Sequence, residues 1–347
     1  MSEQVAVVTG GAGFIGRRLV AALISEGTHV RVLDVAPAPP ALAGNVDYTQ
    51  GSILDDALCR KVFAGADEVY HVAGLAHLWA RDPRMFQTVN GEGTRIVLEA
   101  SRACGAARVV VTSTEVILRG WRDPNPLVCE YDVLPPLKAL AGPYSRSKAI
   151  AHRLSLDAIE RGQDVRIVYP TVPVGAGDDA FTSPTAMIRD FVSRPPPAYL
   201  DCRLNLVDAG DVARGHVLAA RAGRPKGRYI LGGQDLWMHE ILALLEDLSG
   251  VPMPRRRIPF ALALLAGTIS TGLANGVTRQ PPRAPLEGVR LSRMPREVRI
   301  DEARRHLGYA PGPVREALAE TIIWLAEHGH IAKRLDLGAP QPAKRAL

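Results

Sequence analysis

Two side chains four residues apart, Tyr144 and Lys148, could together transfer a proton. They stand at the start of a predicted helix, just after Gly142 and Pro143, and their i, i+4 spacing places both on one helix face. A phenol with a pKa of about 10 is a poor acid–base at neutral pH, and a nearby ammonium favours its charged form. We therefore expect Lys148 to lower the pKa of Tyr144, which would act as general acid–base. The alternative is an ordinary surface pair.

Hydroxyl side chains at the end of another predicted strand could polarise the carbon–oxygen bond that reacts. Thr112, Ser113 and Thr114 follow the apolar run 109–111. Ligands of open α/β sheets bind at the carboxyl ends of strands, so these hydroxyls are candidates for the third catalytic group. The alternative is that local backbone groups satisfy them, as is common for such a run.

A glycine-rich turn between the first predicted strand and the first predicted helix could hold a dinucleotide. The segment Thr9–Gly16 contains G-x-G-x-x-G at positions 11, 13 and 16, and G-x-x-G-x-x-G at 10, 13 and 16. Such glycines permit a tight turn and let a pyrophosphate approach the backbone, while the helix N-terminus faces the phosphates. The strand before the turn and the helix after it are the context that this motif requires.

An acidic residue, Asp34, ends the second predicted strand, 18 residues beyond Gly16. A carboxylate there can accept hydrogen bonds from ribose hydroxyls and would repel a 2′-phosphate. No arginine directly follows Asp34 to offset that repulsion. The sequence therefore predicts NAD as the cofactor, with NADP disfavoured. The alternative is a turn or cap aspartate.

The hydrophobic pattern predicts a scaffold that brings these strand ends together. Between residue 5 and about 170, short β-branched runs alternate with helical stretches, which is typical of a Rossmann-type α/β fold, a doubly wound parallel sheet with helices on both faces. The predicted strands are Val5–Thr9, His29–Asp34, Val46–Gln50, Glu68–His71, Val109–Thr112 and Val165–Tyr169. The predicted helices are Ile15–Glu26, Leu54–Phe63, Met85–Cys104 and Tyr144–Arg161.

After Pro170 the chain becomes rich in Pro, Gly and Asp, which indicates a smaller C-terminal substrate-binding domain. A strand at 228–231 and a helix at 237–248 are expected there. We assign residues 1–170 to the NAD-binding domain, with about 204–232 returning to it, and 171–334 mainly to substrate binding. Residues 279–296 are expected to form a loop and 335–347 a flexible tail.

Composition excludes several other classes of protein. The 347 residues carry 42 Lys and Arg against 36 acidic residues, and this net charge of +6 is too diffuse to indicate nucleic acid. The four cysteines lack metal-ligand spacing, so no metal site is expected and reduced thiols of a cytoplasmic protein are favoured. The first residues pass directly into a strand-like run, leaving no room for a signal peptide.

The longest apolar stretch, Ile258–Ala274, directly follows three arginines at 255–257. It is short for a membrane span and contains proline and glycine. A surface helix that touches anionic lipid is one interpretation. A packed helix of the C-terminal domain is the favoured one.

Along nearly its whole length the sequence resembles the extended short-chain dehydrogenase/reductases, the NAD-dependent epimerase/dehydratase family. The motifs that match in the expected order are Gly10–Gly16, Asp34, His71–Gly74, Asn90–Thr94, Thr112–Thr114, Tyr144 with Lys148, Tyr169–Pro170, Leu204–Asp208, Asp211–Ala213, Gly227–Gly232, Asp301, Leu307–Tyr309 and Trp324. Within the family it is most similar to hopanoid-associated sugar epimerase-like proteins and to the dihydroflavonol reductase/3β-hydroxysteroid dehydrogenase-like branch. That closer likeness lies in Pro173–Gly175, Pro197–Tyr199 and Tyr229–Gly233.

The resemblance implies a role for each matching residue. Tyr144 would be the general acid–base, Lys148 its pKa modulator and ribose ligand, and Thr114 would take the place of the family's usual serine. The implied cofactor contacts are Gly10, Gly13, Phe14, Ile15, Gly16, Asp34, Ser52, Ile53, Val72, Ala73, Gly74, Tyr144, Lys148, Pro170 and Thr171. Ser52 departs from the family's aspartate near adenine. Glu115 and Arg203 are unusual polar residues that either contact substrate or are solvated charges.

These roles lead us to expect an NAD(H)-dependent oxidoreductase that transfers hydride to or from a secondary alcohol or ketone carbon of a small, apolar substrate. One alternative is a sugar or nucleotide-sugar epimerase that uses tightly bound NAD and a keto intermediate. Another is a dinucleotide-binding protein without catalysis. The family habit also suggests a homodimer through the helices predicted at 85–104 and 144–161.

Overall fold

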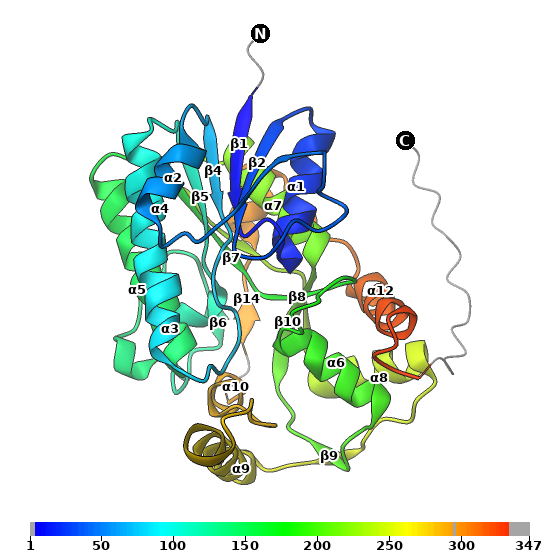
Figure 1. Cartoon of the computed structure of the whole chain (residues 1–347). Helices are drawn as coiled ribbons and strands as arrows, with labels where there is room; N and C mark the ends of the chain where they lie inside the picture. The colour runs from blue at the N-terminus through cyan, green and yellow to red at the C-terminus, as the bar shows by residue number, and fades with distance from the viewer. Residues whose placement is uncertain (1–3, 294–295, 333–347) are drawn as a thin grey trace.

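The computed structural model describes residues 4–293 and 296–332, and a parallel sheet of seven strands lies at its centre (Figure 1). Across the sheet the order is β11-β7-β5-β4-β1-β2-β3, so the direction of winding reverses between β1 and β4. The strands are β1 (Val5–Thr9), β2 (His29–Asp34), β3 (Asp47–Gln50), β4 (Glu68–His71), β5 (Arg108–Thr112), β7 (Val165–Pro170) and β11 (Arg228–Leu231). The predicted Rossmann-type fold is confirmed, and its ligand crevice is expected at that reversal.

Helices cover both faces of this sheet. On one face α1 (Phe14–Ser25) packs against α7 (Ala209–Arg221); on the other, α4 (Gly93–Ala103) packs against both α2 (Asp56–Phe63) and α5 (Pro143–Glu160). The inner strands are covered by helices on both faces, as is usual for a parallel sheet. Every residue of β4 and β7 is buried, as are four of the five in β5.

The single helix predicted at 85–104 is interrupted by a wider turn. The chain forms α3 (Arg84–Phe86), then a π-helical turn η1 (Gln87–Glu92), then α4. Asn90 lies in this turn and is 1% exposed. Its side chain accepts from the backbone N–H of Leu75 at 2.8 Å and donates to the Leu75 carbonyl at 3.1 Å. The π turn thus ties the helix to the segment after β4, and such turns are frequent at functional sites.

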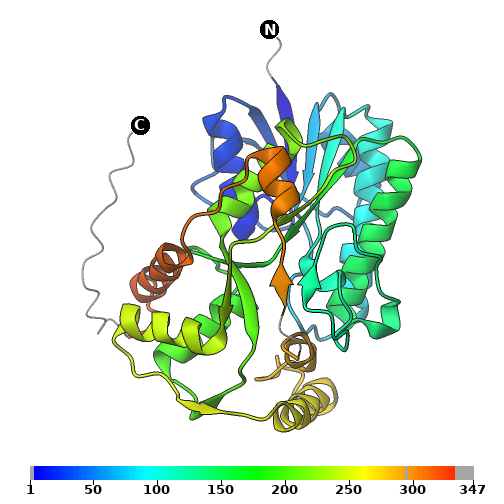
Figure 2. The ribbon, with the colours of Figure 1, turned by 180° about the vertical axis from the view of Figure 1, so that it is seen from behind.

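A second, smaller lobe surrounds the sheet β12-β10-β8. Its strands are β8 (Val172–Val174), β10 (Arg203–Asp208) and β12 (Gln234–Trp237), and its helices are α6 (Ser183–Ser193), α8 (Met238–Ser249) and α12 (Val314–Glu327). Side chains from these helices form a core of their own, with Ile188, Leu245 and Leu318 fully buried. The helix before α12, α11 (Asp301–Leu307), packs instead on α7 and on β11 of the main sheet (Figure 2). The tail predicted at 335–347 lies outside the described residues.

Two short strand pairs join parts of the chain that are distant in sequence. One pair is β6 (Leu127–Val128) with β14 (Glu297–Val298), and the other is β9 (Ala198–Tyr199) with β13 (Arg256–Arg257). Both pairs are parallel. They anchor the chain on either side of the segment 258–293, which contains two further helices described next.

Two expectations for that segment are wrong. Residues 279–296 are not simply a loop, because they include the helix α10 (Leu286–Leu291). The apolar stretch does form a helix, α9 (Phe260–Leu273), continued by the π turn η4 (Ala274–Thr278), but within α9 only Gly267 is buried. A Cβ at Gly267 would lie 3.1 Å from the Val289 side chain, so glycine allows α9 to approach α10 closely. α9 is therefore a surface helix rather than a core helix.

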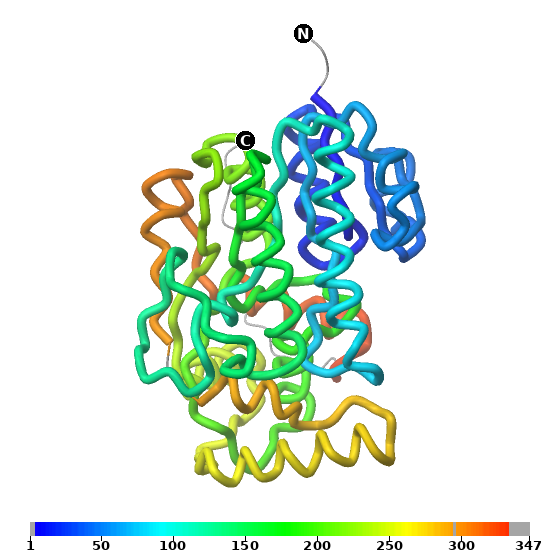
Figure 3. Tube along the Cα trace, turned by 90° about the vertical axis from the view of Figure 1, so that its left-hand side faces the viewer, coloured from blue at the N-terminus to red at the C-terminus, as the bar shows by residue number. Residues whose placement is uncertain are grey.

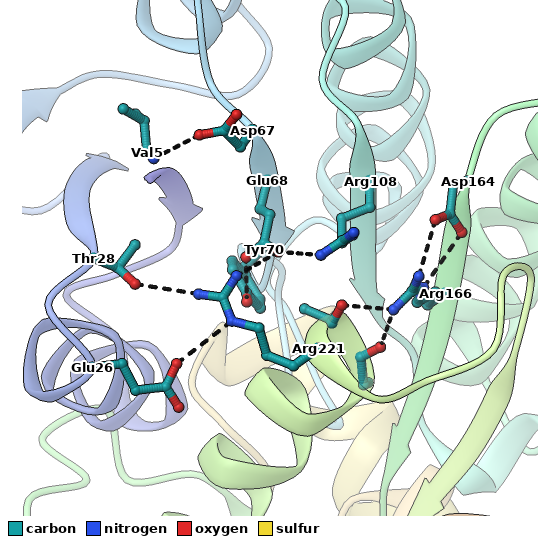
Figure 4. Close-up of polar contacts among 12 residues, drawn as sticks. Val5, Glu26, Thr28, Asp67, Glu68, Tyr70, Arg108, Asp164, Arg166 and Arg221 are labelled. Carbon is teal, nitrogen blue, oxygen red and sulfur yellow. Dashed lines mark hydrogen bonds and ion pairs between the residues drawn. The ribbon is translucent and has the colours of Figure 1, made fainter. Parts of the chain in front are cut away.

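An ion-pair network stabilises the amino-terminal edge of the main sheet, opposite the ligand crevice (Figure 4). Glu68, only 1% exposed, accepts from Arg108 at 2.7 Å, from Arg221 at 2.8 Å and from the Tyr70 hydroxyl at 2.9 Å. Arg221 lies on α7 and also donates to the Thr28 hydroxyl at 3.2 Å. The network therefore links α7 to β4, β5 and the turn before β2.

Candidate active site

The turn between β1 and α1 is shaped to receive a phosphate group. Gly10 has a φ of +74°, and a Cβ there would lie 2.6 Å from the backbone nitrogen of Ala73. A Cβ at Gly16 would overlap the carbonyl oxygen of Gly10. No side chain from the described part of the chain caps α1, so the first-turn N–H groups of Phe14 and Ile15 are left for an anion. These residues fit the pyrophosphate of a dinucleotide.

Asp34 lies at the end of β2, beside this turn. One of its carboxylate oxygens accepts from the backbone N–H of Ala12 and the other from that of Ala36, each at 2.9 Å. Each oxygen keeps capacity for a further hydrogen bond, so ribose hydroxyls can still be accepted. The hydroxyl of Ser52, after β3, accepts from the N–H of Leu54 at 3.2 Å and is thus engaged locally.

The carboxyl ends of β4 and β7 hold most of the remaining cofactor residues that the sequence predicts. Val72, Ala73 and Gly74 follow β4, whereas Pro170 ends β7 and Thr171 follows it. Ile53 is buried against Gly93 on α4. The buried hydroxyls of Ser113 and Thr171 have no hydrogen-bond partner among the described residues. Leaving a buried hydroxyl unpaired costs roughly 1–3 kcal/mol, so these orphaned groups also fit a polar ligand at the strand ends.

Thr114, Tyr144 and Lys148 come together at the carboxyl end of β5. The hydroxyl of Thr114 lies close enough to the phenol of Tyr144 to lower its pKa. The Lys148 ammonium donates to the carbonyl oxygen of Thr112 at 2.8 Å. A Cβ on Gly74 would lie 3.7 Å from Lys148 Nζ, so the ammonium is also close to the segment after β4. The three predicted catalytic side chains thus share one end of the sheet, next to the segment that is predicted to line the cofactor.

Burial controls the protonation of this group. It raises the pKa of the Tyr144 phenol; the nearby Thr114 hydroxyl acts in the opposite direction, and the carboxylates of Glu115 and Glu287 raise the pKa further. Burial also lowers the pKa of Lys148 to about 8. The direction for Tyr144 is opposite to the expected lowering, because desolvation of the phenolate outweighs the favourable contacts. The phenol is therefore protonated at neutral pH.

Two buried histidines support the strand ends beneath the site. The Thr112 hydroxyl is hydrogen-bonded to Nε2 of His216 on α7 at 2.8 Å, and His71 lies between the hydroxyls of Thr9 and Thr94, 2.9 Å from each. Burial lowers the pKa of His216 to about 4 and that of His71 to about 3, and Lys148 contributes in the same direction. Both rings are thus neutral near pH 7 and act as hydrogen-bonding supports.

Glu287 on α10 is a site residue that the sequence reasoning missed. Its side chain accepts from the backbone N–H of Tyr144 at 3.1 Å and from that of Ser145 at 2.8 Å, and so caps the N-terminus of α5. It is 4% exposed, and burial raises its pKa. One signal was present in the sequence: Gly142, just before the helix, and Pro143, its first residue, offer no capping side chain, so the cap has to come from elsewhere.

Glu115 and Arg203, the two polar residues for which the sequence left two roles open, lie in different parts of the structure. Glu115 is buried directly beside the catalytic group, where it accepts from the Thr114 hydroxyl at 3.1 Å. Burial raises the pKa of Glu115, and the positive charge of Arg296 lowers it in part. Arg203 lies on β10 and pairs with Asp235 of β12 at 3.9 Å. Glu115 therefore belongs to the site, whereas Arg203 makes a contact within the smaller lobe.

Residues 6–232 match the NAD dependent epimerase/dehydratase family. A protein assigned as a dihydroflavonol 4-reductase in Synechocystis sp. is 32% identical over 330 residues, which cover 93% of this chain and 95% of that protein. The 4-hydroxy-2-methyl-3-oxo-4-farnesyl-3,4-dihydroquinoline-1-oxide ketoreductase of Stigmatella aurantiaca is 31% identical over 313 residues, which cover 87% of this chain and 91% of that one. The crystal structure of gox2253 superposes with a TM-score of 0.82 at 30% identity, covering 95% of this chain and all of that one.

Proposed function

This chain belongs to the NAD-dependent epimerase/dehydratase family, and from this premise we propose that it reduces the ketone, or oxidises the secondary alcohol, of a small apolar molecule with Tyr144 as general acid–base. The family match confirms the expected enzyme class and the expected NAD cofactor. The substrate and the role of Tyr144 belong to the proposal.

One observation carries the proposal: the hydroxyl of Thr114 lies close enough to the phenol of Tyr144 to lower its pKa. Two neighbouring hydroxyls can hold one substrate oxygen between them, with Tyr144 donating its proton as the carbonyl becomes an alcohol. Bound NAD(H) supplies or accepts the hydride. Lys148 lies on the same helix and can donate to ribose hydroxyls.

The protonation of Tyr144 supports the reductive direction. Because burial raises the pKa of this phenol, it is protonated at neutral pH and can act as an acid without further preparation. A carbonyl that accepts hydride needs such an acid at its oxygen. The Synechocystis and Stigmatella relatives are both named as reductases. The substrate in the name of the Stigmatella ketoreductase carries a farnesyl group, which supports an apolar ketone as the substrate class.

The direct test is turnover of a panel of apolar ketones by the purified chain with NADH. We expect stoichiometric NADH oxidation with at least one flavanonol, steroid or prenylated ketone. Tyr144→Phe should lower kcat by about 10²- to 10⁴-fold and Thr114→Ala by about 10²-fold. Tyr131→Phe, an exposed position, serves as the matched control and should change nothing. Full activity in Tyr144→Phe would refute the acid–base assignment.

The same assay separates the reductase from the epimerase alternative. A nucleotide-sugar epimerase would convert its substrate without net NADH consumption and would carry NAD through purification. Conversion of UDP-sugars without added cofactor, together with no turnover of any ketone, would therefore replace the reductase proposal.

A further inference from the structure

The surface helix α9 and the turn η4 expose one row of apolar side chains. Leu262, Leu265, Ile269 and Leu273 recur every three or four residues and so share a helix face, where each is 50 to 58% exposed. Val277 continues the row and is 74% exposed. Figure 3 shows α9 as the outermost element at the lower end of the molecule, with α10 above it. We call these five side chains the apolar row.

The opposite face of α9 is fixed to the protein. Gly267 contacts α10, and the hydroxyl of Thr271 accepts from the backbone N–H of Leu286 at 2.9 Å. In η4, the side chain of Asn275 accepts from Trp79 Nε1 at 2.8 Å. By length and composition Phe260–Thr278 could cross a membrane. Because both ends of the helix are anchored on the same body, however, it lies along the surface of the protein rather than standing out from it.

Positive charge predominates around the apolar row, where Arg255 pairs with Glu246 at 2.8 Å and Arg257 with Asp201 at 3.2 Å. Between residues 248 and 286 the sequence contains five arginines and no acidic residue. The arginines lie at both ends of the helix and all are exposed: Arg255, Arg256, Arg257, Arg279 and Arg283. An exposed apolar row flanked by arginines at each end is the pattern of a helix that lies in the interface of an anionic bilayer.

A basic groove continues this surface beside the start of α9. It encloses about 510 Å³, and its charged lining consists of four basic side chains and one carboxylate: Arg122, Lys138, Arg146, Arg290 and Asp123. The guanidinium of Arg293 lies 5.5 Å from the ring of Trp121 in the groove wall and 5.3 Å from the ring of Phe260, the first residue of α9. The groove and the apolar row therefore form one continuous surface suited to anionic headgroups.

We propose that this surface docks on a membrane that contains anionic lipid, with the apolar row among the acyl chains and the arginines on the headgroups. A second copy of the chain fits this surface less well. In a symmetric dimer that paired two α9 helices, the arginines at 255–257 and 279 would face other arginines, and like charges repel. A lipid surface matches both the apolar row and the charge at its ends.

The test is sedimentation of the full chain with vesicles of phosphatidylcholine alone or mixed with phosphatidylglycerol. We expect binding only to the mixed vesicles, weakened when salt rises from about 0.1 M to about 1 M. The double variant Leu265→Ser/Ile269→Ser should weaken binding by at least roughly tenfold, because each buried leucine or isoleucine contributes strongly. Arg256→Glu/Arg279→Glu should weaken it by about fivefold or more for each arginine lost.

Matched controls separate docking from misfolding. Val133→Ser replaces an apolar side chain that is 91% exposed in another loop, and it should bind as the unchanged chain does. The positions substituted on α9 are exposed, so circular dichroism and melting temperature should be preserved. Equal binding to both vesicle types, or unchanged binding of both double variants, would overturn the proposal. So would a dimer that dissociates in Leu265→Ser/Ile269→Ser without vesicles, since a second copy would then cover the row.

Discussion

The carboxylate of Glu287 accepts a hydrogen bond from the backbone N–H of Tyr144, a residue 143 positions earlier in the chain. A negative charge at a helix N-terminus is favourable, and α5 begins with two residues that cannot cap it. The same charge raises the pKa of the Tyr144 phenol. One side chain on α10 therefore both fixes the start of the catalytic helix and favours the protonated phenol.

Glu287→Gln should separate these two effects. The amide keeps one oxygen acceptor but removes the charge, so the free energy of unfolding should fall by about 1 kcal/mol and the pKa of Tyr144 should move down. Denaturant unfolding measures the first, and tyrosinate absorbance, compared with the Tyr144→Phe variant, measures the second. Glu297→Gln changes an exposed carboxylate and is the control. An unchanged pKa of Tyr144 in Glu287→Gln would show that the carboxylate does not act on the phenol.

Local periodicity predicts the regular parts of this fold well and its irregular parts poorly. The strands β1 and β2 begin and end at the predicted residues, because β-branched residues recur along both, at Val5, Val7 and Val8 of β1 and at Val30 and Val32 of β2. The π turn around Asn90 was not predicted, because it depends on contacts with Leu75 from a different part of the chain. The exposed outer face of α9 was only the less favoured interpretation, since apolar composition alone favours a packed helix.

Removing the charge of Asp34 should relax the choice of cofactor. Asp34→Asn keeps an acceptor for the N–H of Ala12 but no longer repels a 2′-phosphate. The ratio of kcat/KM for NADPH to that for NADH should rise by roughly tenfold or more. Steady-state kinetics with both cofactors measures this ratio. Asp47→Asn, on the outer strand β3, is the control, and an equal ratio in both variants would remove Asp34 from the ribose site.

The network around Glu68 should act on stability alone. Glu68→Ala leaves Arg108 and Arg221 without their shared buried carboxylate, which should lower the free energy of unfolding by about 2 kcal/mol. The partly exposed arginines can be solvated, and this keeps the loss moderate. Activity of the folded variant should match that of the unchanged chain because the network lies at the opposite edge of the sheet. Denaturant unfolding and kcat measured on the same sample test both statements.

The site residues that sequence could identify are those whose relationship is local. Tyr144 and Lys148 lie one helical turn apart, and the turn Gly10–Gly16 joins one strand to the next helix, so their spacing alone predicted a shared function. Glu287 could not be found in this way, because its hydrogen-bond partners lie on α5, far from it in the sequence. The residues just before it are rich in proline and arginine and show no helical pattern. Burial of the phenol, which sets the direction of its pKa, also depends on packing that no local pattern describes.

Lys148 should set the alkaline limit of the reductive activity. Burial lowers its pKa to about 8, so the ammonium loses its proton as the pH rises through that value, whereas Tyr144, with its raised pKa, stays protonated. The value of kcat/KM for NADH should be constant between about pH 6 and 7 and then fall by about tenfold per pH unit above 8. Lys148→Arg keeps a charge throughout this range and should be less active but flat. A decline that persists in Lys148→Arg would assign the alkaline limit to a different group.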